Sequence, residues 1–204
     1  MTSSGRDRAD EADEAEAGGE AREQFGAFVA QHARGLDRLA YLMVGDEHAG
    51  EDLAADALLA AWQHWDKVRR ADNPLAYVRR ILVNQASEHY RRRARESTVL
   101  GRLKLSAGEA TQEPDNAAVA DVRSALLRLP ERRRACLVLR HCFGLTEEDV
   151  ARTLGISVGT VKSQTSKAVT QFRREIGDAA LTVSDTPGPD RPETGPRKTA
   201  QHAR

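Results

Sequence analysis

The most informative part of the sequence is residues 145–175, which read LTEEDVARTLGISVGTVKSQTSKAVTQFRRE. Ala151, Gly155 and Val161 have the spacing of a helix-turn-helix. The small residue lets two helices cross closely, the glycine occupies the turn between them, and the β-branched residue packs the second helix on the first. The spacing predicts a helix-turn-helix over residues 146–172. An ordinary helical hairpin with a solvated face is the alternative.

The sequence contains an N-terminal capping signal for each helix of this motif. Thr146 precedes three acidic residues and Ser157 precedes the second helix, and hydroxyl caps and early acids stabilise helix N-termini. The second helix is expected from about Val158 to Arg174. Its N-terminal half carries short donors and cations suited to phosphates and base edges in a DNA major groove. These candidate DNA-binding residues are Ser157, Thr160, Lys162, Ser163, Thr165, Ser166 and Lys167.

Helical apolar spacing also fills the first half of the chain. One helix is expected from Phe25 to Met43, a second within residues 51–65, and a third from Asn73, a cap followed by proline at the first helical position. No strand-like alternation is visible, so we expect an all-α fold of two small helical domains joined by a flexible linker. The expected boundaries are a disordered acidic tail at 1–22, a bundle at 23–95, a linker at 96–118, the helix-turn-helix domain at 119–176 and a disordered Pro-rich tail at 177–204.

Charge and cysteine content narrow the function classes. The net charge is zero, yet residues 67–95 hold nine Lys or Arg against two acids. A second basic stretch covers residues 123–174, so two places that neutralise phosphates are expected. Two cysteines make no disulfide framework, no apolar window is long enough to cross a membrane, and the N-terminus lacks the pattern of a secretion signal. We therefore expect a cytoplasmic protein with no membrane partner.

On these residues the chain resembles the sigma-70 superfamily of RNA polymerase sigma factors, and within it the extracytoplasmic-function (ECF) type, including the actinobacterial sigma-E-like group. EDLAADALLAAWQHW (51–65) looks like region 2.2 running into 2.3, NPLAYVRRILVNQASEHYRRR (73–93) looks like region 2.4, and LPERRRACLVLRHCFGLTEEDVARTLGISVGTVKSQTSKA (129–168) is similar to region 4. The resemblance implies an alternative sigma factor that recognises minus-thirty-five and minus-ten promoter elements and promotes promoter melting. It implies no enzymatic activity, no cofactor and no metal. The partners it implies are core RNA polymerase, through the β′ clamp and the β flap, promoter DNA and an anti-sigma factor, in a cytoplasmic protein that joins the nucleoid through polymerase.

The resemblance also implies that Glu51, Asp52 and Asp56 dock on the clamp helices of the β′ subunit. Asp52 and Asp56 recur at four-residue spacing, rotated away from the apolar stripe of Leu53 and Ala57, so core packing does not explain them. A solvated charged face without a partner is the alternative.

The third helix and the loop before it would, by the same resemblance, melt the promoter and read the minus-ten element. Asn84 can satisfy a base edge as both donor and acceptor. Arg79 and Arg80, together with residues 91–93, can hold phosphates. The candidates on the polar face of this helix are Tyr77, Arg80, Asn84, Ser87 and Arg91.

Two aromatic residues and two cysteines invite further functional interpretations. Trp62 and Trp65 could stack on an unpaired base, but at helical spacing we assign them to core packing. Cys136 and Cys142 lie close to His141, which suggests zinc or redox chemistry. Three candidate ligands among apolar neighbours favour buried thiols instead.

Two other function classes remain open. A polymerase-independent helix-turn-helix regulator needs no acidic docking face and normally dimerises, and footprinting without polymerase separates it from a sigma factor. A metal-dependent nuclease would use the carboxylates at 51, 52 and 56. No phosphate loop, strand scaffold or clear histidine partner accompanies them.

The expected linker sets a geometric limit on promoter recognition. A flexible chain of about 25 residues has a typical end-to-end distance of ~27 Å and reaches ~85 Å at full extension. Promoter elements about two helical turns apart are separated by ~70 Å. A scaffold must therefore hold the linker extended, and in the proteins that this chain resembles polymerase is that scaffold.

Overall fold

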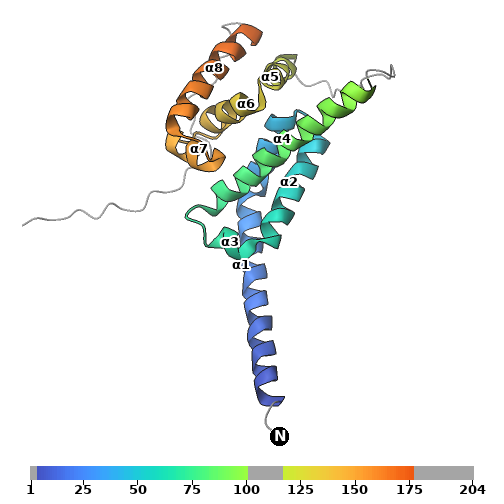
Figure 1. The fold of residues 1–204 in the computed structure, drawn as a ribbon, viewed down its shortest axis with the longest axis vertical. Helices are drawn as coiled ribbons and strands as arrows, with labels where there is room; N and C mark the ends of the chain where they lie inside the picture. Colours follow the sequence, from blue (N-terminus) through green and yellow to red (C-terminus); the bar gives the residue numbers. More distant parts are fainter. Residues whose placement is uncertain (1–3, 101–116, 177–204) are drawn as a thin grey trace, which may run out of the picture.

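The computed structural model describes residues 4–100 and 117–176, and every regular element in these ranges is a helix, which confirms the all-α prediction. The elements are α1 (Ser4–Val44), α2 (Glu47–Gln63), α3 (Trp65–Arg69), α4 (Pro74–Leu100), α5 (Ala117–Leu127), α6 (Glu131–Leu137), the π-helical turn η1 (Val138–Cys142), α7 (Glu147–Leu154) and α8 (Val158–Ile176). Elements α1–α4 form one unit, here called the N-terminal unit, and α5–α8 form the C-terminal unit that lies against it (Figure 1).

The N-terminal unit is a bundle in which α1, α2 and α4 pack against one another. Leu39, Ala57 and Leu82, one from each helix, are completely buried at its centre. Burial of a leucine side chain stabilises the fold by about 2 kcal/mol. A Cβ at Gly50 would lie only 3.1 Å from the backbone nitrogen of Tyr41, so this glycine lets α2 cross α1 closely.

Local sequence signals set the boundaries of these helices: α4 begins after its predicted cap, whereas α2 begins at Glu47, before the expected range of 51–65. Helix α1 ends before Gly45, whose φ of +76° suits glycine. Asp46 then caps α2, because its Oδ1 accepts a hydrogen bond from Ala49 N (2.8 Å). Asn73 caps α4 in the same way, with Ala76 N donating to Asn73 Oδ1 at 2.9 Å.

The N-terminal end differs from the prediction. Helix α1 begins at Ser4 and continues through residues 4–22, where composition led us to expect a disordered tail. This part of α1 extends away from the bundle (Figure 1). The prediction rested on the lack of apolar side chains to bury, whereas the many Glu, Ala and Arg residues favour a helix by intrinsic propensity alone.

The linker prediction also differs at its ends. Helix α4 continues to Leu100 and α5 begins at Ala117, so part of the predicted linker is helical. Residues 101–116, like the predicted tail at 177–204, lie outside the described residues.

The two tryptophans have different environments. Trp65 is buried, with its ring centroid 5.1 Å from that of Phe25 and 5.4 Å from that of Phe28. Trp62 also contacts Phe25, at 5.1 Å, but keeps 37% of its surface exposed. The packing assignment therefore holds fully for Trp65 and only partly for Trp62.

The C-terminal unit packs α8 against both α6 and α7. Leu139, Val150 and Val161 are completely buried between these elements. At the end of η1, Phe143 N donates to Val138 O (3.2 Å), a five-residue step that widens the last turn before α7.

Candidate functional site

Helices α7 and α8 form the predicted helix-turn-helix. Gly155 sits in the turn with φ +64°, a left-handed conformation that glycine adopts at no steric cost. Ile156 N donates to Ala151 O at 3.1 Å and so closes the turn. Ala151 and Val161 are buried where the two helices cross, as the spacing predicted.

Hydroxyl side chains cap both helices of the motif. Thr146 Oγ1 accepts a hydrogen bond from Asp149 N (3.1 Å), and Ser157 Oγ accepts one from Thr160 N (3.1 Å). Partial burial by itself would raise the pKa of Asp149, but the hydrogen bonds from Thr146 and the charge of Arg152 hold this pKa below its ordinary value. The carboxylate therefore stays ionised at the positive end of α7, where it stabilises the helix.

The outward face of α8 carries most of the predicted DNA-binding residues. Ser157, Lys162, Ser163, Ser166 and Lys167 are exposed. Lys162 Nζ lies 3.5 Å from Glu147 Oε2 of α7, and because Lys162 itself is exposed, this ion pair contributes little to stability and leaves the lysine able to bind phosphate.

Two threonines of the predicted set lie differently. Thr160 is half-buried, and its hydroxyl pairs with Ser157 Oγ at 2.8 Å. Thr165 is also half-buried, with a buried hydroxyl oxygen that has no hydrogen-bond partner among the described residues. Thr165 therefore points into the unit, not toward a ligand on the outer face of α8.

The polar face of α4 presents the predicted minus-ten residues in two groups. Asn84, Arg80 and Arg91 are exposed, while Tyr77 and Ser87 are half-buried. Arg91 Nη1 lies 3.5 Å from Glu88 Oε2, and this exposed ion pair contributes little to the stability of the fold.

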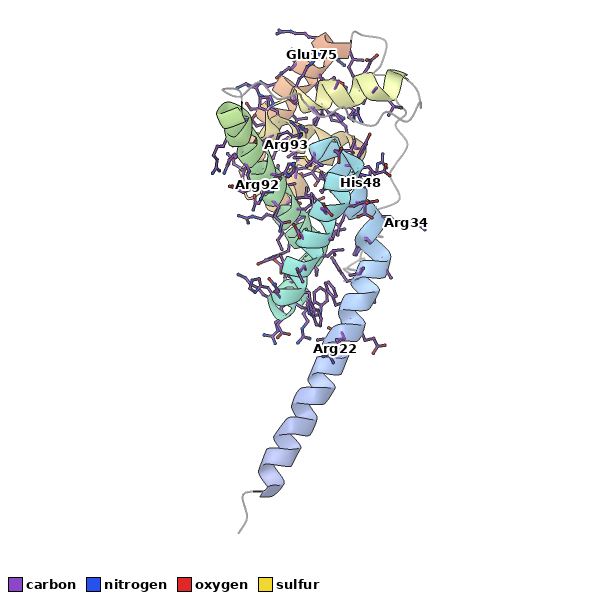
Figure 2. All side chains as sticks on the ribbon, turned by 90° about the vertical axis from the view of Figure 1, so that its right-hand side faces the viewer. Arg22, Arg34, His48, Arg92, Arg93 and Glu175 are labelled. Carbon is purple, nitrogen blue, oxygen red and sulfur yellow. The ribbon has the colours of Figure 1, made fainter. Side chains whose placement is uncertain are left out.

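Arginine side chains of α4 divide between solvent and interior. Arg92 and Arg93 are exposed and lie at the same end of the molecule as Glu175, far from Arg22 on the extension of α1 (Figure 2). Arg79 is different, because only 6% of it is exposed and its guanidinium lies over the ring of Phe143 at 5.3 Å from the centroid. The expectation that Arg79 holds phosphate does not fit this arrangement.

An acidic surface on the outer side of α2, here called the α2 acidic face, contains Glu51, Asp52 and Asp56, all exposed as predicted. Asp37 of α1 adds a carboxylate that sequence reasoning missed. Partial burial and then repulsion by Glu51 raise the pKa of Asp37, so the two carboxylates act on each other across the helix pair.

The α2 acidic face also carries an apolar side chain that sequence reasoning missed. Leu59 is 55% exposed and lies one turn beyond Asp56, on the same side of α2. The sequence did contain a signal for this position, because Leu59 follows the outward-facing Asp56 by three residues and therefore lies on the same side of the helix.

The cysteines are thiols in apolar surroundings. Burial raises the pKa of Cys136 to about 11 and raises that of the half-buried Cys142 as well. Burial lowers the pKa of His141, and the charge of Arg140 lowers it further. Among the described residues, no three His, Cys, Asp or Glu side chains gather as metal ligands would, and no helix there is long and apolar enough to cross a membrane.

Comparisons with known proteins match both units. The family described as Sigma-70 region 2 matches residues 28–96, and the family described as Sigma-70, region 4 matches residues 120–172. An RNA polymerase sigma-E factor of Streptomyces avermitilis is 34% identical over 157 residues, which cover 75% of this chain and 85% of the relative. The chain belongs to the ECF sigma factors of the sigma-70 family.

Further relatives of this sigma factor agree. The ECF RNA polymerase sigma factor SigM of Mycobacterium tuberculosis is 30% identical over 156 residues, with coverage of 76% of this chain and 79% of SigM. Among solved structures, the complex of the sigma factor RpoE with the anti-sigma factor NepR from Bartonella quintana matches 77% of this chain at 24% identity and a TM-score of 0.64, covering 99% of that chain. CnrH, solved in complex with the cytosolic domain of CnrY, matches 75% of this chain and 87% of its own at 24% identity and a TM-score of 0.57. These two likenesses establish the fold of both units of the sigma factor.

Proposed function

We propose that this sigma factor binds core RNA polymerase through the α2 acidic face. The observation that carries the proposal is the position of Asp52 and Asp56, which are exposed, one helical turn apart and directed away from the core. An anionic face with an exposed leucine beside it suits a basic helical partner, here the clamp helices of β′. Co-purification of the chain with core polymerase tests this directly.

Promoter DNA would contact two other surfaces. The exposed face of α4, with Asn84, Arg80 and Arg91, would read and melt the minus-ten element. The exposed face of α8 would lie in the major groove of the minus-thirty-five element, next to the β flap. Neither surface overlaps the α2 acidic face in sequence or helix, so all three contacts can be made by one chain.

The proposal also includes the cellular location of the chain, its role as a binding subunit and a further protein partner. It acts in the cytoplasm as a binding subunit and not as an enzyme, because its exposed polar residues are arranged as contact surfaces and not as a catalytic constellation. RpoE and CnrH were each solved with a partner protein, which is the anti-sigma factor NepR for RpoE. An anti-sigma factor is accordingly a proposed partner here, and affinity capture from the source cell with this chain as bait tests it.

Promoter readout by α4 and α8 can be separated with two alanine substitutions. Asn84→Ala should slow open-complex formation about tenfold, since one lost base contact costs about 1–3 kcal/mol, while polymerase binding stays unchanged. Lys162→Ala should weaken binding of upstream duplex and lower the salt dependence of that binding by about one unit of slope. Permanganate reactivity reports melting, and fluorescence anisotropy over a salt series reports duplex binding. Equal loss of polymerase affinity in both variants would contradict this division of roles.

Residues 24–176 should be sufficient for basal transcription with core polymerase. Phe25 is the first aromatic residue of α1 that packs against the bundle, through Trp62 and Trp65, so a cut before it preserves the core. Run-off transcription by the shortened chain, compared with the full chain at equal concentration, checks the expectation. Loss of activity with helicity retained would assign a role in initiation to one of the removed ends.

A further inference from the structure

Helices α6 and α8 lie side by side in the C-terminal unit (Figure 1) and leave an open cleft between them, here called the α6–α8 cleft. Its volume is about 450 Å³. The side chains that line it are Arg133, Ser166, Lys167, Thr170, Gln171, Arg174 and Glu175. All of these side chains are polar or charged, and an apolar ligand would leave them without hydrogen-bond partners. The α6–α8 cleft therefore suits a polar or ionic ligand.

The charge of the α6–α8 cleft is positive. Arg133, Lys167 and Arg174 contribute cations, whereas Glu175 contributes the one carboxylate of the lining. That carboxylate is already neutralised, because Glu175 Oε2 lies 2.7 Å from Arg128 Nη1. Among the described residues, none of the three cations of the cleft lies within ion-pair distance of a carboxylate. An anion bound in the cleft would therefore meet three uncompensated positive charges.

Gln171 of α8 holds the arginine of α6 in place. Arg133 Nη1 donates to Gln171 Oε1 at 3.1 Å, and Gln171 Nε2 donates in turn to Arg128 O at 3.3 Å. The bond between Arg133 and Gln171 is partly buried, so this guanidinium has less rotamer freedom than a fully solvated arginine. A guanidinium has five N–H donors, and this bond uses one of them. Arg133 is thus a positioned cation whose other donors match the geometry of a phosphate group.

The α6–α8 cleft is continuous with the face of α8 that is proposed to read DNA. Ser166 and Lys167 belong to both surfaces. From Ser157 to Arg174 the helix is about 25 Å long at about 1.5 Å per residue, whereas the major groove is about 12 Å wide. A helix whose N-terminal residues contact base edges therefore carries its last two turns past the edge of the major groove, where the sugar–phosphate backbone lies. Arg174 and the cleft are on that part of α8.

We propose that the α6–α8 cleft is a phosphate site for the DNA strand that borders the major groove of the minus-thirty-five element, with Arg133 and Arg174 as its two sequence-independent contacts. The inference rests on the proposed function, because that function places α8 in this major groove. Continuity with the base-reading face favours DNA over an acidic protein segment as the occupant. The two contacts fix the register of α8 on the duplex and add affinity that is the same for every base sequence.

A pair of double variants of the full-length chain tests this site. Arg133→Ala with Arg174→Ala removes two cations of the cleft, and Arg132→Ala with Arg173→Ala removes their exposed neighbours on the same helices, which do not line the cleft. Both variants have the same net charge. The probe is a mixed-sequence duplex of about 30 base pairs, whose binding is followed by fluorescence anisotropy over a salt series.

Loss of two phosphate contacts should lower the slope of log affinity against log salt concentration by about two units. It should also weaken binding at least about tenfold at about 0.1 M salt, whereas the neighbour variant should stay within about half a unit of the wild-type slope. Equal slopes for the two double variants would overturn the phosphate site. Run-off transcription that falls only in the cleft variant, with duplex binding unchanged, would also overturn it and would identify the occupant as a protein segment.

Lys162→Ala, measured in the same salt series, separates this inference from the proposed function. If Lys162→Ala lowers the slope and the cleft variant does not, α8 binds DNA as proposed and only the cleft assignment is wrong. If the wild-type chain shows no salt-dependent binding to the duplex, the proposed role of α8 fails and the cleft assignment fails with it.

A single charge reversal covers the case in which loss of the bond between Arg133 and Gln171 unfolds the double variant. Arg174→Glu places a carboxylate in the cleft, where it repels phosphate, and Arg173→Glu is the matched control on the same turn of α8. Both arginines are exposed and lie in the last turn, so the two reversals have the same effect on the helix dipole. Arg174→Glu should bind the duplex at least about tenfold more weakly than Arg173→Glu, with the same circular dichroism. Equal affinity of these two variants would overturn the proposal without any reference to the double variant.

Discussion

Reversing two carboxylates, Asp52→Arg together with Asp56→Arg, is expected to abolish co-purification of this sigma factor with core RNA polymerase. Both side chains are exposed on the α2 acidic face. Like charges placed across an interface cost several kcal/mol, and about 3 kcal/mol already weakens binding more than a hundredfold. Substitution of exposed charges changes folding by about half a kcal/mol, so circular dichroism and thermal unfolding should stay close to wild type. Pull-down with tagged core polymerase and run-off transcription measure the loss.

Glu20→Arg together with Glu23→Arg is the matched control, because it makes the same change of net charge on exposed positions of α1. This control should co-purify normally. A doubly reversed α2 variant that bound polymerase and initiated like wild type would refute the docking assignment, and equal loss in both variants would point to a general effect of charge.

Arg134→Ala is expected to lower the free energy of unfolding by about 3 kcal/mol. The substitution removes the guanidinium that donates hydrogen bonds to the backbone carbonyls of Met43, Leu127 and Leu129. A hydrogen bond from a charged donor contributes about 1.5–3 kcal/mol to stability. It also opens a cavity beneath Tyr90, where the side chain is now 2% exposed. Urea unfolding of the full chain, followed by circular dichroism, gives the change in midpoint and slope.

Arg132→Ala on the same helix is the appropriate comparison, because Arg132 is exposed. Its effect should stay within about half a kcal/mol. Similar stability of the two variants would show that the carbonyl contacts of Arg134 add nothing to the folded state.

Local signals allowed much of this fold to be predicted. A cap and a proline mark the start of α4 at Asn73, a glycine with positive φ marks the turn of the helix-turn-helix, and a hydroxyl cap marks each of its helices. Each of these depends on residues within four positions along the chain, which is the range over which backbone propensity and capping act. The outward direction of Asp52 and Asp56 followed from the same helical periodicity.

The features that escaped prediction depend on contacts between distant parts of the chain. The arginine side chain of Arg79 is of a type that binds phosphate. It is buried because Phe143 of the other unit packs against it, which the local sequence does not reveal. The contact of Arg134 with Met43 joins positions 91 residues apart. Asp37 belongs to the α2 acidic face because α1 and α2 pack together, which no periodicity within either helix reveals.

The buried apolar residues of the two units make up one continuous cluster, in which Leu36 and Leu82 of the N-terminal unit belong together with Leu139 and Phe172 of the C-terminal unit. Melting either unit would therefore expose apolar surface on the other, and the free chain should unfold as one cooperative block with a single calorimetric transition. A protease cut between residues 101 and 116 would remove the covalent connection and leave this shared cluster in place. The nicked protein would then behave as a non-covalent dimer of its own two halves, whose melting temperature depends on concentration.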